Sequence, residues 1–208
     1  MGNIFRADGP FVRFMNRATD LVILNIIFII SCLPIVTAGA AFTALHTICM
    51  RMIRNEDGYI VRGYWKAFCE NFKQSTVIWL LQIVVAVILR VDVRFLENMH
   101  GVIYTLITIA VAAVFVVILM GSVYVYPLQA RFQNTVVGTI KNAVLISILN
   151  FPKTLLLLMI YAIPIVAMLS SFETMPYSLL VGFALSCYIS AVLLVEILKK
   201  YEPKISEE

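Results

Sequence analysis

Leu33-Pro34-Ile35-Val36-Thr37-Ala38-Gly39 interrupts an apolar run that extends from Leu21 to Met50 without a formal charge. A continuous helix over this run would be about 45 Å long, whereas the hydrocarbon core of a bilayer is roughly 30 Å thick. Proline removes a backbone hydrogen-bond donor, and glycine permits the backbone conformations that end a helix. We therefore predict a helical hairpin that is broken near Pro34.

The composition around this hairpin is that of an integral membrane protein. Of the 208 residues, 62% are hydrophobic and only 13% are charged, which is too little charge to cover a water-soluble globule. The formal net charge is +4, but the basic residues stand at the ends of apolar runs and not in a patch interleaved with aromatic residues. This pattern is typical of membrane orientation signals and argues against a nucleic-acid partner.

The remaining apolar runs predict an all-α, polytopic transmembrane helix bundle with five to six membrane crossings, in a single integral membrane domain over residues 1–208. Two polar connections, about 55–73 and 131–150, are expected to form amphipathic connecting helices on the cytoplasmic side. The helices expected within the bilayer cover about 10–33, 38–54, 75–89, 101–130, 154–172 and 176–195.

The distribution of lysine and arginine predicts the orientation in the membrane. If the first apolar run is a hairpin, fourteen of the sixteen basic residues share one side of the bilayer, and only Arg90 and Arg94 lie on the other. A single crossing by that run would worsen the ratio to eleven against five. Because basic residues favour the cytoplasmic side, we predict six crossings with both termini in the cytoplasm.

A stretch with helical periodicity follows the polar turn at 55–58. Its apolar positions recur one helical turn apart, with basic residues between them, as in a helix that lies in the membrane interface or docks on the bundle. The alternative interpretation is a binding face for a cytoplasmic partner. The candidate face consists of Tyr64, Trp65, Phe68 and Phe72.

Polar side chains within the apolar runs define two further candidate sites. Asn25 and Gln82 are amides near the middle of separate spans, where they either bond helices together or line a solute path. On the opposite side of the membrane, a charged cluster forms either a solvated rim or a candidate outer entrance for an anionic or sugar solute. That cluster consists of Arg90, Asp92, Arg94 and Glu97.

Signatures of enzymes and cofactors are not found in the sequence. Only two histidines and four widely separated cysteines occur, without the spacing of a zinc site or a catalytic triad. No glycine-rich loop of the kind that cradles a nucleotide phosphate occurs. We therefore expect a protein that is not an enzyme and that holds no metal or cofactor.

The chain contains an internal echo. Asn71-Phe72-Lys73-Gln74-Ser75 resembles Asn150-Phe151-Pro152-Lys153-Thr154, which lies seventy-nine positions later and also precedes an apolar run. This similarity predicts a parallel repeat over approximately 38–96 and 120–172. Chance similarity between apolar runs is the alternative explanation.

Several short motifs in the first 80 positions occur together in one known family. They are Asp8, Pro10, Arg13, Asp20-Leu21, Asn25, Leu33-Pro34-Ile35-Val36-Thr37, Gly39, Thr43-Ala44-Leu45, Asp57-Gly58-Tyr59-Ile60 and Asn71-Phe72-Lys73-Gln74. Through them the chain resembles the YesL-like family of bacterial integral membrane proteins, whose function is unknown. Gly9 departs from the family pattern, which has serine between the aspartate and the proline. The resemblance implies the bacterial plasma membrane and genes for carbohydrate uptake and degradation as neighbours.

These observations lead to two functional hypotheses. The first is a non-enzymatic protein that is accessory to, or regulates, carbohydrate uptake, with carbohydrate transporter subunits as partners that bind its cytoplasmic amphipathic connections. The second is a small-solute channel or carrier that acts by itself, as a homo-oligomer, through a path lined by Asn25 and Gln82. The lipid bilayer is the expected environment in both.

Overall fold

A computed structural model describes residues 10–56, 58–96, 101–132, 134–170 and 172–201. These residues form helices and connecting turns without a β-strand, and six of the helices are long and apolar enough to cross a membrane. The expected all-α polytopic fold is thereby confirmed. The elements are α1 (Pro10–Cys32), η1 (Ile35–Thr37), α2 (Ala38–Ile53), α3 (Ile60–Leu96), α4 (Val102–Arg131), α5 (Val136–Leu149), α6 (Phe151–Ser170), α7 (Met175–Tyr177), η2 (Ser178–Gly182) and α8 (Phe183–Lys199).

The break near Pro34 is confirmed as a hairpin turn between α1 and α2. A single 3-10 turn, η1, follows the proline, and α2 begins directly after it. The hydroxyl of Thr37 lies 2.6 Å from the carbonyl oxygen of Ser31 and 2.8 Å from that of Pro34. The first contact pairs a carbonyl group in the last turn of α1. The second lies within the turn, where the carbonyl group of Pro34 also accepts from the backbone N–H of Thr37 at 2.9 Å, so the turn is held closed locally.

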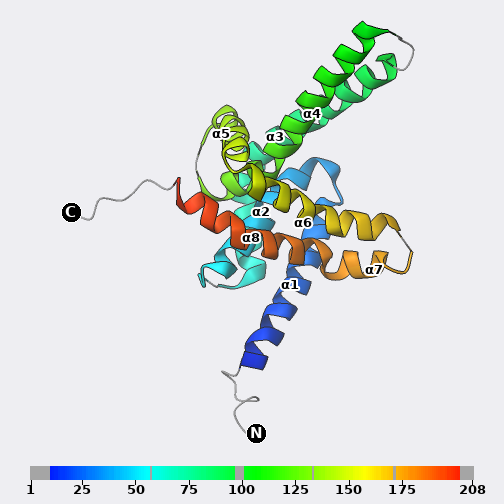
Figure 1. Cartoon of the computed structure of the whole chain (residues 1–208). Helices are drawn as coiled ribbons and strands as arrows, with labels where there is room; N and C mark the ends of the chain where they lie inside the picture. The colour runs from blue at the N-terminus through cyan, green and yellow to red at the C-terminus, as the bar shows by residue number, and fades with distance from the viewer. Residues whose placement is uncertain (1–9, 57, 97–100, 133, 171, 202–208) are drawn as a thin grey trace, which may run out of the picture.

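Helix α2 lies at the centre of the molecule, surrounded by α1, α3, α4 and α8 (Figure 1). Thirteen of its sixteen residues are buried, and most of them are small or aliphatic. Small side chains allow neighbouring backbones to approach: a Cβ atom added to Gly39 would collide with the backbone carbonyl of Ser75. One turn further along, the hydroxyl groups of Thr43 and Ser75 form a hydrogen bond of 2.8 Å.

Helix α3 differs from the expectation of a separate amphipathic helix followed by a span. It is one continuous helix of 37 residues, Ile60–Leu96, and therefore about 55 Å long. The physical reason is that residues 64–96 contain neither glycine nor proline, so nothing ends the helix where its exposed face changes from charged to apolar. The second connection is a separate helix, α5, but it is largely apolar, with Lys141 as its single charged residue, so the expectation that it is amphipathic is wrong.

The helices that follow extend in pairs. In Figure 1, α3 and α4 run side by side as an arm that projects from the body, and α6 and α8 form a second pair. Helices α4 and α6 continue through Pro127 and Pro164, respectively, although proline removes a backbone hydrogen-bond donor from a helix. The carbonyl group of Pro164 instead accepts a hydrogen bond of 2.7 Å from the hydroxyl of Ser178, on η2.

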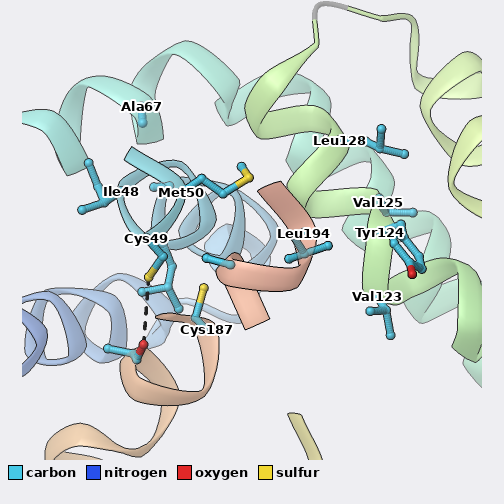
Figure 2. Packing of buried hydrophobic residues seen from close by; sticks show 14 of the residues in the cluster. Ile48, Cys49, Met50, Ala67, Val123, Tyr124, Val125, Leu128, Cys187 and Leu194 are labelled. Atoms are coloured by element: carbon cyan, nitrogen blue, oxygen red, sulfur yellow. Dashed lines mark hydrogen bonds between the residues drawn. The ribbon is translucent and has the colours of Figure 1, made fainter. Parts of the chain in front are cut away.

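The core lies where α2, α4 and α8 meet (Figure 2). Cys49 of α2 and Cys187 of α8 are buried there together with Leu194, and the thiol of Cys49 lies 3.9 Å from the carbonyl oxygen of Ala184. Between helices in a bilayer, close packing and hydrogen bonds contribute more than the hydrophobic effect, because lipid tails are as apolar as leucine. The core is therefore stabilised mainly by close packing and by polar contacts between the helices.

Candidate functional site

The four residues of the candidate partner face form one aromatic cluster in the first turns of α3. The ring centroids of Trp65 and Phe68 are 5.5 Å apart in an edge-to-face contact, and those of Phe68 and Phe72 are 5.6 Å apart. Tyr64 contacts both Trp65 and Phe68. Such contacts hold the rings in fixed positions on the helix.

The four rings differ in solvent exposure, so only part of the candidate face is accessible to a partner. Tyr64 is fully buried in the core, so it supports the cluster from beneath and is not a surface that a partner could contact. Phe68 packs partly against the core, and Phe72 is half-buried. Trp65 is 43% exposed and is flanked by exposed Arg62 and Lys66. The accessible part of the face is therefore centred on Trp65.

Asn25, a candidate for the solute path, joins α1 to the irregular start of the last span. Its side-chain amide donates to the carbonyl oxygen of Leu179 at 2.6 Å and accepts from the backbone N–H of Ala184 at 2.8 Å. The π-helical turn η2 shifts the helical hydrogen-bond pattern at this point, and the fully buried asparagine pairs with both backbone groups. This arrangement is a packing contact between helices.

Gln82, the other path candidate, bonds α3 to α4. Its carbonyl oxygen accepts a hydrogen bond of 2.5 Å from the hydroxyl of Tyr126. The two amides thus pair with different helices and do not lie in one hydrogen-bonded group. Both positions agree with the packing interpretation, and the solute path stays a prediction.

Two sets of hydrogen-bonded polar side chains inside the protein were not predicted from the sequence. On α4, Gln129 donates to Gln74 of α3 and accepts from Thr139 of α5 at 3.2 Å, which ties three helices together. No local signal predicts these pairs, because the partners are up to 55 positions apart and share no motif. Only the packing of the helices brings them together.

The second unpredicted group surrounds His46, which is buried in α2. Its Nδ1 lies 2.7 Å from the carbonyl oxygen of Phe42, which can only accept, so Nδ1 carries the proton. In the neutral ring Nε2 then accepts from the hydroxyl of Tyr161 at 2.9 Å. Tyr161 also lies 2.7 Å from the hydroxyl of Ser190, so the chain of contacts joins α2, α6 and α8.

The candidate outer entrance lies at the far end of α3. Arg90, Asp92 and Arg94 are exposed there, and Glu97 lies outside the described residues. Among the residues that the structure describes, no group of three or more histidine, cysteine, aspartate or glutamate side chains has an arrangement that could hold a metal ion.

Part of the chain is similar to a known protein family. Residues 21–93, which extend from α1 through most of α3, are similar to a family described as "Protein of unknown function, DUF624". This match is consistent with the resemblance to the YesL-like proteins and attaches no activity to the chain. No curated protein and no solved structure matches. The protein thus combines a helical architecture suited to a membrane with a matched region of unknown function.

Proposed function

We propose that the protein is a non-enzymatic accessory of a carbohydrate uptake system in the bacterial plasma membrane. In this proposal, the start of α3 projects into the cytoplasm and binds a transporter subunit. The resemblance to the YesL-like family, whose genes stand beside carbohydrate genes, supports the choice of carbohydrate as the transported class.

The single observation that carries the proposal is the exposure of Trp65 among positive charges. A tryptophan held by neighbouring rings loses little conformational freedom on binding, and exposed aromatic residues with adjacent arginine are typical of interface hot spots. Arg62 and Lys66 provide charge that favours an acidic surface on the partner. Because Lys66 also lies 3.9 Å from Glu70, its charge is partly compensated within the helix.

The test is affinity purification from native membranes in a mild detergent, followed by mass spectrometry of co-purifying proteins. We expect a stoichiometric transporter subunit with the wild-type chain and at least about a tenfold loss of it with Trp65→Asp, since a buried hot-spot side chain contributes about 2 kcal/mol or more. Trp65 is a cleaner probe than Phe68, because Phe68 also contacts the core.

Two controls separate loss of binding from loss of folding. Trp65→Phe keeps an aromatic ring and should retain most of the partner. Lys141→Asp changes charge at an exposed position of α5, outside the candidate face, and should leave recovery of the partner unchanged. Undiminished recovery of the partner with Trp65→Asp, or recovery of this chain alone from the wild-type preparation, contradicts the proposal.

A further inference from the structure

A cavity of about 620 Å³ lies where three of the candidate spans meet. Its wall is formed by the first half of α1, the end of α2 and the start of α3. This volume is within the range of roughly 300–1,000 Å³ that small-molecule sites occupy. By the distribution of basic residues, this end of the three helices is the one predicted to face the cytoplasm.

The cavity is lined by an excess of positive charge. Arg13 and Arg17 stand one turn apart on α1, and Arg51 reaches the cavity from the last turn of α2. Two carboxylates, Asp20 and Glu56, also line it, but Glu56 is bonded at 2.8 Å to Arg54, which is not part of the lining. Within the described residues, neither Arg13 nor Arg51 forms an ion pair, so two guanidinium groups are available to a ligand.

An apolar path leads away from the cavity along α1. Ile23 lies in the cavity wall, and Ile26 and Ile30 follow it at helical spacing, each with a substantially exposed side chain. A cationic cavity at the cytoplasmic end of a span, continued by an exposed apolar stripe, matches the two parts of an anionic phospholipid. The headgroup would occupy the cavity while an acyl chain follows the stripe.

We propose that this cavity binds a phosphate group through Arg13 and Arg51, carried either by an anionic lipid or by a soluble phosphate. Guanidinium groups suit phosphate because their planar set of donors pairs with two of its oxygens at once. The stripe of Ile23, Ile26 and Ile30 favours the lipid as the source. The cavity does not include Trp65, so the proposal that it binds phosphate does not depend on the proposal that Trp65 binds a partner.

The first arm of the test measures lipid retention. The full-length protein is reconstituted into nanodiscs of phosphatidylcholine with phosphatidylglycerol, extracted in mild detergent, and the retained lipids are counted by native mass spectrometry. We expect enrichment of phosphatidylglycerol with the wild type and at least about a fivefold lower enrichment with the double variant Arg13→Gln/Arg51→Gln. The matched control, Arg90→Gln/Arg94→Gln, removes the same charge from the far end of α3 and should retain the lipid.

The second arm uses inorganic phosphate with the delipidated protein in detergent, and reads the melting temperature against an equal ionic strength of chloride. A ligand that binds only the folded state raises its stability, so a phosphate-dependent shift that Arg13→Gln/Arg51→Gln abolishes assigns the site to a soluble phosphate. A response in the lipid arm alone assigns it to the headgroup. If neither arm distinguishes this double variant from the control, the proposal is overturned.

Discussion

Gly39 is the position where a single atom decides how closely two helices pack. Replacing glycine by alanine inside a helix usually stabilises it by about 0.5–1 kcal/mol, because glycine loses more backbone entropy on folding. At Gly39 the added Cβ atom would meet the carbonyl oxygen of Ser75 and lie 2.7 Å from the Cβ atom of Trp79, and neither can move without shifting α3. We expect the collision to outweigh the gain in propensity.

Gly39→Ala should therefore lower the free energy of unfolding by about 1–3 kcal/mol, the usual cost of overpacking, and lower the melting temperature in detergent. Gly58→Ala is the matched control, because an added Cβ atom there meets no atom within 4 Å. Equal melting temperatures for the two variants would show that α2 and α3 are not in this close contact.

At the scale of elements, the hairpin of α1 and α2 reaches only part of the way along α3. At the tip of the hairpin, the indole N–H of Trp79 donates a hydrogen bond of 2.8 Å to the carbonyl oxygen of Ile35. From the tip, α2 runs beside the charged first half of α3. The apolar part of α3 extends a further eleven residues, about 16 Å, from Trp79 to Arg90. Leu33, Ile35 and Val36 at the tip expose apolar side chains, as a turn that contacts lipid would.

We therefore predict that the tip ends inside the bilayer as a re-entrant hairpin, which replaces the six crossings predicted from the basic residues by four and keeps both termini on the same side. Backbone inside a bilayer must form its hydrogen bonds within the protein. At the tip, Trp79 and contacts within the turn provide hydrogen bonds to backbone groups. A cysteine introduced by Val36→Cys should resist membrane-impermeant maleimides added from either side, in a background without the native cysteines. Asp92→Cys, at the exposed end of α3, should react from the outside. Labelling of both cysteines from outside at similar rates would contradict a re-entrant tip and favour a full crossing.

At the scale of the whole molecule, the two halves share particular contacts. Asn71 and Asn150 each donate a side-chain hydrogen bond to the carbonyl group four residues earlier. Four residues further on, Ser75 bonds Thr43 and Thr154 bonds Tyr124, in each case on the preceding long helix. The halves differ at the junction, where α3 is continuous but α5 and α6 are separate helices. The parallel repeat over 38–96 and 120–172 stays a prediction, which these equivalent contacts support.

The accessory function and the carrier function differ in what the isolated protein does in a membrane. The hydrogen bonds of Asn25 and Gln82 already join helices, so we expect liposomes that contain only this protein to pass sugars no faster than empty liposomes. The measurement is uptake of labelled monosaccharide, with a known sugar channel as the positive control. Flux that the wild type supports and Asn25→Leu abolishes would favour the channel or carrier instead.

The sequence by itself determined the membrane class, the hairpin at Pro34 and most helix positions, because apolar length, charge placement and helix breakers act locally along the chain. It also indicated that Trp65 and its neighbours share one helical face. Only the tertiary structure decided that Tyr64 is buried while Trp65 is exposed, that Asn25 pairs with η2 and α8, and that Arg13 and Arg51 line one cavity. Each of these facts depends on contacts between residues far apart in the chain, and local periodicity carries no information about such partners.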